Sequence, residues 1–251
     1  MVRLIFYNIE YLEGLQGKKI DYLKVWRRVE HPKGIEKRLA AALKKYNPDI
    51  VSFAEIGGSS FLEKDYFSYI GRKLGMKHRT KHLKYKLDGS MRLLKKVPVL
   101  NQQTNGILSK NKISNVRTLY LKEGAKKAVI KAKIGGVNLL LVHLALGKGT
   151  RKKQIDELVE IVREINGPVI LAGDFNTFKG EEEIKPLIKK AALKHKFRLH
   201  GGRVFTYPTY HPRKRFDYIL TSKDVKVKEY SVLDMPFSDH LPVMVDFEVK
   251  N

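Results

Sequence analysis

The chain has 251 residues and a hydrophobic fraction of 43%, so it can bury a large core, and it has no apolar run of the roughly 18 residues that a transmembrane helix needs. It has no cysteine, which excludes disulfides and thiolate metal sites. Its 50 Lys and Arg against 26 Asp and Glu give a net charge of +24. That excess predicts a polyanionic partner, nucleic acid before an anionic membrane surface. The alternative is a lysine-coated surface that serves thermal stability.

The organisation of the chain is simple. The N-terminal segment reads as a short strand without the apolar core of a signal peptide, so we expect a cytoplasmic protein. We find no internal repeat, low-complexity tract or Pro/Gly/Ser linker, and we expect one domain over residues 1–251. Nothing indicates an oligomer, and a monomer is assumed.

Hydrophobic spacing predicts strands alternating with a few helices. Helices are expected over residues 35–46, 60–74, 150–165 (with Thr150 as its N-cap) and 181–193. Strands are expected at 2–8, 49–55, 78–83, 104–109, 115–121, 127–133, 137–143, 169–172, 204–208, 216–221 and 243–249. The dipeptide Gly135-Gly136 predicts a hairpin. This order fits two packed mixed sheets with helices outside.

Polar residues stand at the ends of several apolar runs. Glu55 follows residues 50–53, His143 follows 139–142, and Asp174 and Asn176 follow 169–172, while His240 precedes the run 243–245. Carboxylates can hold a divalent metal, histidines move protons and amides orient a phosphate. The pattern therefore predicts a phosphate-ester cleavage site. Each residue also has a plainer explanation: a strand-end surface acid, an Asx-turn, or a core histidine with satisfied hydrogen bonds.

These segments, taken in order, resemble the endonuclease/exonuclease/phosphatase superfamily, which has the deoxyribonuclease-I-like fold. The matching stretches cover nearly the whole chain: residues 6–9, 48–55, 105–109, 142–144, 172–176, 215–220 and 238–240. The resemblance implies an α+β fold, a four-layer α/β/β/α sandwich of two mixed, mainly antiparallel sheets. It also implies an enzyme that depends on Mg²⁺ or Mn²⁺.

The resemblance assigns a metal site to Glu55, Asn8 and Asp239. Mg²⁺ takes one or two carboxylates and completes its shell with water and substrate oxygens, which such a set suits. One departure is Ala54, where the family usually carries a glutamine before the glutamate.

Five further residues receive catalytic roles from the resemblance. Asp174 would orient or deprotonate the attacking water, and Asn176 would contact a phosphate oxygen, both from one face of an extended segment. Asp217 would fix the tautomer of His240. His143 would bind phosphate or protonate the leaving group, which favours the histidine-carrying branches over the abasic-site endonuclease branch. The partner of His143 stays open, with Asp88 as the only nearby acid.

Two basic segments point to the substrate. Residues 72–97 hold ten Lys or Arg and one acid, and residues 184–216 hold ten Lys or Arg, three His and no acid. Aromatic residues interleave with the second, a composition typical of nucleic-acid binding. Arg215 could instead hold the acidic cluster together. The candidate contacts are Arg79, Lys81, Lys95, Lys96, Arg213, Lys214, Arg215, Tyr207 and Tyr210.

The sequence thus predicts a nuclease that hydrolyses phosphodiester bonds in DNA or RNA. One alternative keeps the fold and acts on a phospholipid or a small phosphate ester. Another is a non-catalytic nucleic-acid-binding protein. The sequence leaves open DNA against RNA, endo- against exonuclease action, and one metal ion against two.

Overall fold

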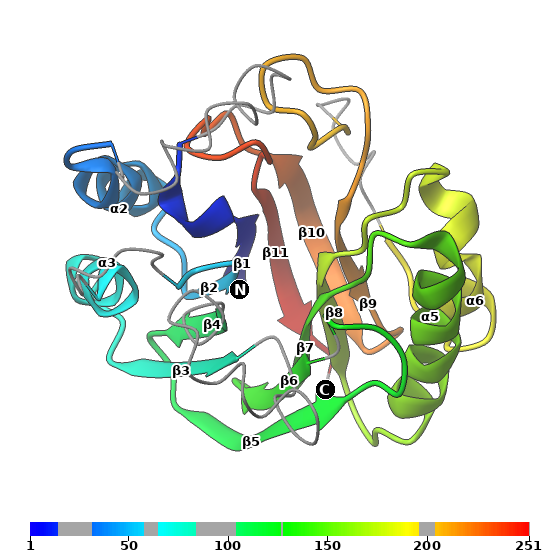
Figure 1. Cartoon of the computed structure of the whole chain (residues 1–251). Coiled ribbons are helices and arrows are strands. Elements are labelled where there is room, and N and C mark those ends of the chain that lie inside the picture. Colours follow the sequence, from blue (N-terminus) through cyan, green and yellow to red (C-terminus); the bar gives the residue numbers. More distant parts are fainter. Residues whose placement is uncertain (15–31, 58–64, 84–103, 127, 196–203, 251) are drawn as a thin grey trace, which may run out of the picture.

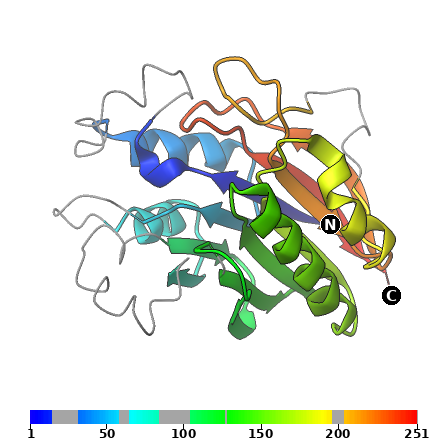
Figure 2. The same cartoon turned by 45° about the vertical axis from the view of Figure 1, so that its right-hand side comes forward.

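The computed structural model describes residues 1–14, 32–57, 65–83, 104–126, 128–195 and 204–250. Two β-sheets face each other at the centre and helices cover both outer faces (Figure 1), so the predicted four-layer α/β/β/α sandwich is confirmed. The layers are also visible after a turn of the view (Figure 2), where two of the helices lie in front of one sheet.

Within the described residues, one sheet has six strands in the order β10-β11-β1-β2-β4-β3 and the other has five in the order β5-β6-β7-β8-β9. The pairs β1–β2 and β7–β8 are parallel and all others are antiparallel. The strands of the first sheet are β1 (Val2–Asn8), β2 (Ile50–Ala54), β3 (His78–Leu83), β4 (Thr104–Ser109), β10 (Val225–Val232) and β11 (Val243–Val249). Those of the second are β5 (Ile113–Tyr120), β6 (Ala128–Ile134), β7 (Val137–His143), β8 (Val169–Asp174) and β9 (Asp217–Thr221).

The helices are α2 (Ile35–Lys45), α3 (Tyr66–Lys73), α5 (Lys148–Arg163) and α6 (Lys185–Lys189), with short 3₁₀ segments η1 (Glu10–Leu12) and η4 (Gly180–Ile184). Three apolar clusters hold the layers together. One fills the space between the sheets, a second packs α2 and α3 on the first sheet, and a third packs α5 and α6 on the other. Because β2 and β8 are covered on both faces, their side chains are buried throughout, as expected of parallel pairs.

Several element boundaries differ from the prediction. Residues 204–208 form no strand beyond an isolated bridge from Tyr207 to Lys214, because Pro208 has no N–H to donate to a ladder. Strand β10 was not predicted, since a register shift between Val227 and Glu229 interrupts its alternation. Of the helix predicted at 60–74, the described part begins at Tyr66, with Asp65 as a side-chain N-cap.

Thr150 is not the cap of α5, which begins two residues earlier at Lys148 after Gly147. The earlier start places Arg151 in the first turn, where its guanidinium donates to the carbonyls of Ala145 and Leu146 and pairs with Glu183. The helix predicted at 181–193 is split into η4 and α6. No described helix is long and apolar enough to cross a membrane.

Candidate active site

The ends of β1, β2, β7 and β8 and the start of β9 bring the predicted polar residues to one edge of the sandwich. Asn8 lies opposite Ala54 in the β1–β2 pair, so that Glu55 follows beside it. On the facing sheet, Asp174 lies opposite His143 on one side and Asp217 on the other. The two sheets are joined here by a hydrogen bond of 3.0 Å from Asn8 Nδ2 to Asp174 Oδ2.

Gly173 explains why strands β7 and β8 can approach so closely at this edge. A Cβ at this position would lie 2.2 Å from the carbonyl oxygen of Val142. No side chain fits there, so a larger residue would push β8, and Asp174 with it, away from His143.

Asp217 and His240 form the predicted pair. Asp217 Oδ2 lies 2.8 Å from His240 Nδ1, and both residues are buried. Burial lowers the pKa of His240, but the charges of Asp217, Asp239 and Asp174 raise it more, to well above 6.5. The carboxylate of Asp217 therefore accepts the Nδ1 proton, and the surrounding acids favour the imidazolium form of the ring, whose Nε2 atom lies 3.9 Å from Asp174 Oδ2.

Asp174 is buried and accepts hydrogen bonds from Asn8 Nδ2 and from the backbone N–H of Asn176. Burial raises its pKa, the charges of His240 and Lys126 lower it, and the result is about 6. The raised pKa of His240 and the pKa of about 6 for Asp174 together favour a protonated imidazole beside an ionised carboxylate.

Asn176 reaches the site through a turn and not through the predicted extended spacing. Its backbone is left-handed, with φ 51°, and its N–H bond to Asp174 is an Asx-turn. The plainer explanation of an Asx-turn is therefore confirmed for Asn176, and a contact with phosphate stays a prediction. Asn176 Nδ2 donates to the carbonyl of Leu144, next to His143.

Ligand atoms of Asp174, Asp217 and His240 lie within 4.8 Å of one another, an arrangement that could hold a metal ion. Two of the three already share the 2.8 Å hydrogen bond between Nδ1 and Oδ2. A metal ion bound by all three would compete with that hydrogen bond for Nδ1 or Oδ2.

A second acidic group gathers around Glu55 and includes Glu10, which the sequence reasoning missed. Burial and the charges of Asp239, Glu13 and Glu55 raise the pKa of Glu10 to about 10. Its Oε2 atom is buried without a hydrogen-bond partner among the described residues. The signal was available in the sequence, since Glu10 lies two residues beyond Asn8.

By the chemistry of their donor atoms these residues suit a divalent cation of the Mg²⁺ or Mn²⁺ kind, whereas the ligand atoms that lie within 4.8 Å of one another in the described part of the chain are those of Asp174, Asp217 and His240. Glu10, Glu55 and Asp239 offer carboxylate oxygens and Asn8 an amide oxygen, the hard ligands that such ions prefer. The crowding that keeps Glu10 protonated is what a bound cation would relieve.

Backbone strain is concentrated at this edge. Glu10, Tyr11 and Leu12 all have positive φ, as does Glu55. Tyr11 is held in place by its N–H, which donates to the Glu55 carbonyl, and by its hydroxyl, which donates to Glu55 Oε1 at 3.2 Å. Such conformations persist where the surroundings fix them, and they are common at functional sites.

Three charged groups neighbour His143 in the described part of the chain. Its Nδ1 lies 3.7 Å from Glu55 Oε1 and its Nε2 lies 3.4 Å from Asp174 Oδ2. Lys126 Nζ also contacts Nε2 and was not predicted. Asp88, the candidate partner, lies outside the described residues.

The predicted nucleic-acid contacts fall in different places. Arg79 and Lys81 are exposed on β3, and Lys81 Nζ lies 3.9 Å from Asp65. Lys95 and Lys96 lie outside the described residues. Arg213 and Tyr210 are exposed in the segment before β9.

Tyr207 belongs to a row of aromatic rings that leads from His240 to the surface. The ring of Tyr207 lies 5.1 Å from that of His240 and stacks on Phe216 at 4.9 Å. Phe178, which is 46% exposed, meets Phe216 edge-on at 4.8 Å. Lys214 Nζ lies 4.8 Å from the centre of the Phe178 ring.

Arg215 has two hydrogen-bond partners away from Asp217, with which a shared strand face was expected. Its guanidinium donates to Glu181 at 2.8 Å and to the carbonyl of Val204 at 2.7 Å, and the residue is buried. The residue lies before β9 begins, so strand alternation does not fix its direction. This position favours a structural role over contact with a backbone phosphate.

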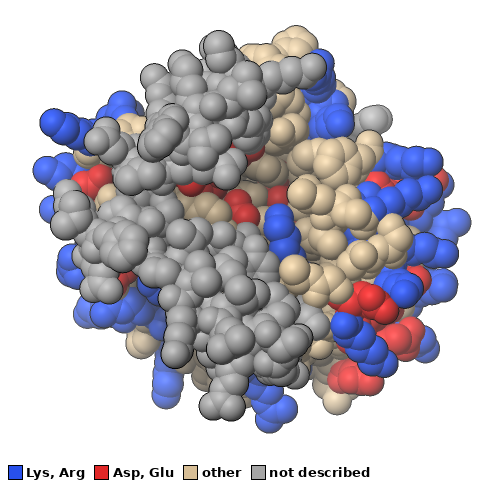
Figure 3. Space-filling view, viewed as in Figure 1, with Lys and Arg blue, Asp and Glu red and all other residues tan. Residues whose placement is uncertain are grey.

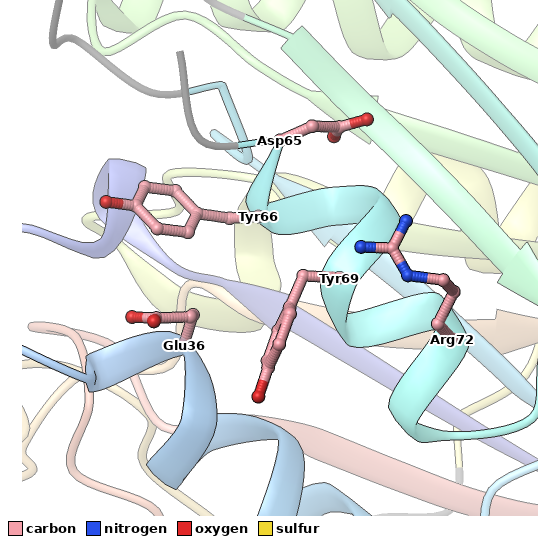
Figure 4. Close-up of a pocket in the computed structure, with 5 residues that line it drawn as sticks. All are labelled: Glu36, Asp65, Tyr66, Tyr69 and Arg72. Atoms are coloured by element: carbon pink, nitrogen blue, oxygen red, sulfur yellow. The ribbon is translucent and has the colours of Figure 1, made fainter. Parts of the chain in front are cut away.

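The surface shown in Figure 3 has acidic side chains near the middle of the face, while lysines and arginines are spread around its periphery. A separate cavity of about 240 Å³ lies between α2 and α3, lined by Glu36, Asp65, Tyr66, Tyr69 and Arg72 (Figure 4). It contains none of the predicted site residues.

Comparison with known proteins now identifies the class. The Endonuclease/Exonuclease/phosphatase family model matches residues 33–240, most of the chain, and the chain therefore belongs to this family. Its members are hydrolases, nucleases and phosphatases among them.

Individual relatives are more distant. A "UPF0294 protein" of Erwinia tasmaniensis is 35% identical over 117 residues, which are 45% of this chain and 41% of that protein. The match thus spans less than half of the relative. Humanized D. rerio TDP2 has a similar structure, with a TM-score of 0.69 at 16% identity and 99% of both chains covered. A mannosyl-6-phosphatase of Bacteroides thetaiotaomicron has a TM-score of 0.67 at 17% identity, with 99% of this chain and 100% of that chain covered. These likenesses show the shared fold.

Proposed function

We propose that this protein is a divalent-metal-dependent nuclease that hydrolyses phosphodiester bonds in DNA or RNA. The observation that carries the proposal is the juxtaposition of two groups at one strand edge. One is the Asp174–His240–Asp217 cluster, and the other is the set of hard oxygen ligands around Glu55.

In this proposal the protein's own residues divide the proton chemistry. Asp174, ionised above about pH 6, orients or deprotonates the water that attacks phosphorus in line. His240, kept protonated by Asp217, donates to the phosphate through Nε2. His143 binds the phosphate or protonates the leaving oxygen. A Mg²⁺ or Mn²⁺ ion held by Glu55, Asn8, Asp239 and Glu10 would supply charge neutralisation.

Nucleic acid is favoured as the substrate by the aromatic row and by the net charge of +24. Rings from Tyr207 to Phe178 extend outward from His240, and Lys214 lies over the last of them. Flat aromatic rings can stack on nucleic-acid bases, while nearby cations pair with the phosphates. A cytoplasmic location and a monomeric state stay predictions from the sequence.

A small phosphate ester is the second candidate, because the fold also resembles a mannosyl-6-phosphatase. A cleavage screen decides between the two. Labelled single-stranded, duplex and structured DNA and RNA are compared with phosphomonoesters, with Mg²⁺, Mn²⁺ and a chelator. We expect metal-dependent cleavage of oligonucleotides that Glu55→Gln abolishes. Intact oligonucleotides alongside released inorganic phosphate would refute the nuclease proposal.

A further inference from the structure

Lys126 is a cation at the centre of the acidic site that none of the assigned roles uses. Its Nζ atom donates to Nε2 of His143 and lies 3.9 Å from Glu55 Oε1. The side chain is only 20% exposed. An ammonium has donors and no acceptor, so Nε2 of His143 is the acceptor here and the ring proton lies on Nδ1, which faces Glu55.

The short loop that carries Lys126 is fixed to the body of the protein by one buried side chain. Gln154 of α5 is 0% exposed, and its Nε2 donates to the carbonyls of Glu123 and Lys126 at 2.8 and 2.9 Å. Its Oε1 accepts the N–H of Ala145 at 2.8 Å. All three bonds are to backbone groups, so the amide can be placed in only one orientation.

The same amide thus connects two parts of the site. Ala145 lies two residues beyond His143, so Gln154 fixes the end of β7 and the Lys126 loop relative to each other. Gly124 makes the approach possible, because a Cβ there would lie 3.0 Å from Gln154 Nε2 and its φ is +88°. A buried amide with every bond satisfied is costly to replace, which suits a positioning device.

The acidic groups of the site outnumber His240, whose raised pKa favours the imidazolium, so a phosphate benefits from a further cation in addition to any metal. A phosphodiester entering it meets the carboxyl groups of Glu55, Asp174, Asp217 and Asp239, which repel it. A divalent ion on the Glu55 side compensates part of that charge. Lys126 lies in the loop between β5 and β6, where its Nζ contacts His143 Nε2, and its charge lowers the pKa of Asp174.

We propose that Lys126 is the phosphate-binding cation of this site and that Gln154 is the positioning residue that holds it there. The proposal rests on the proposed phosphate-ester hydrolysis at this edge. When a phosphate enters, the ammonium turns from Nε2 of His143 to a non-bridging oxygen. Nε2 is then free to take up the proton that Asp174, 3.4 Å away, removes from the attacking water, and to pass it to the leaving ester oxygen. The competing explanation is that Lys126 only fills the place of the metal ion beside Glu55.

Direct binding of inorganic phosphate tests the proposal without requiring cleavage. Phosphate affinity at saturating Mg²⁺ is measured by calorimetry for wild type, Lys126→Ala and Lys126→Arg. We expect Lys126→Ala to weaken binding about 10- to 100-fold, the loss expected for one charge-assisted hydrogen bond, and Lys126→Arg to restore most of it. Lys122→Ala is the matched control, since Lys122 belongs to the same loop and is exposed.

Metal affinity separates the two explanations. If Lys126 only fills the place of the metal ion beside Glu55, Lys126→Ala should tighten Mg²⁺ binding and leave phosphate binding unchanged. That result would overturn the proposal. Unchanged phosphate affinity in Lys126→Ala would overturn it as well. Lys126-dependent phosphate binding in a protein that cuts no nucleic acid would reject the nuclease and keep the inference.

Gln154 is tested through a double-mutant cycle. If Gln154 acts through Lys126, Gln154→Met weakens phosphate binding in wild type and has little further effect in Lys126→Ala. Equal losses in both backgrounds would show a general structural role. Gln154→Glu cannot donate to the two carbonyls and is the second variant if Gln154→Met folds poorly. It should weaken phosphate binding in wild type and have little further effect in Lys126→Ala. Thermal unfolding of each variant shows which of them keep the fold.

Discussion

Replacing Glu10 by Gln tests the metal site through stability. Burial and the charges of Asp239, Glu13 and Glu55 raise the pKa of Glu10 from 4.5 to about 10, so the metal-free folded protein keeps this group protonated at neutral pH. The unfolded chain ionises it near its ordinary value. The ordinary pKa of 4.5 lies about 2.5 pH units below pH 7, and each unit corresponds to about 1.4 kcal/mol. Keeping Glu10 protonated in the folded state therefore lowers the free energy of unfolding by about 3 kcal/mol at pH 7.

The sign of the pH dependence follows from the raised pKa. Between pH 4.5 and about 10 the folded state binds one more proton than the unfolded state, and stability falls as pH rises. Gln keeps the shape and stays neutral. Metal-free Glu10→Gln should therefore be more stable than wild type by about 3 kcal/mol at pH 7, and the gap should widen by about 1.4 kcal/mol per pH unit.

Urea unfolding with a chelator at pH 5, 6, 7 and 8 measures this gap. Glu160→Gln is the control, because its side chain on α5 is 64% exposed and should change stability little at any pH. A gap that stays flat from pH 5 to 8 would refute the reasoning about Glu10.

Adding Mg²⁺ or Mn²⁺ completes the test. A cation bound by ionised Glu10 stabilises only the folded state, so wild type should gain more stability from metal than Glu10→Gln, and the gap should narrow. An equal gain in the two proteins would mean that Glu10 is no ligand.

Three further predictions concern catalysis and substrate binding. His240→Ala should lower kcat about 10²- to 10⁴-fold, and adding Asp217→Asn should cost far less than the product of the single losses; fully additive losses would argue against a dyad. Arg213→Ala and Lys214→Ala should each flatten the log–log salt dependence of oligonucleotide binding by about one unit, acting mainly on KM, and an unchanged slope would point to a charge excess that serves solubility or stability. Phe178→Ala should raise KM for oligonucleotides about tenfold but change it little for a phosphodiester without an aromatic group, whereas equal effects on both would remove the stacking role.

The sequence alone was sufficient for the fold class and for most strands. Strands end where an apolar run meets a polar residue, and this signal is local. It placed β1, β3, β4, β7 and β11 at their observed bounds. It also placed Asn8, Glu55, His143 and Asp174 at strand ends, because periodicity and strand length determine which residue comes last. Residue order then made the family recognisable.

The tertiary structure decided which of these residues meet and in what charge state. Asn8 contacts Asp174 from the facing sheet, and at a sequence separation of 166 nothing in the sequence signals that contact. The raised pKa of Glu10 depends on burial and on Asp239, far away in the chain. In the sequence nothing distinguishes Lys126 from the other lysines. Only the folded loop, held by Gln154, brings its charge to His143, because electrostatics depends on distance in space and on exclusion of water, neither of which is local in sequence.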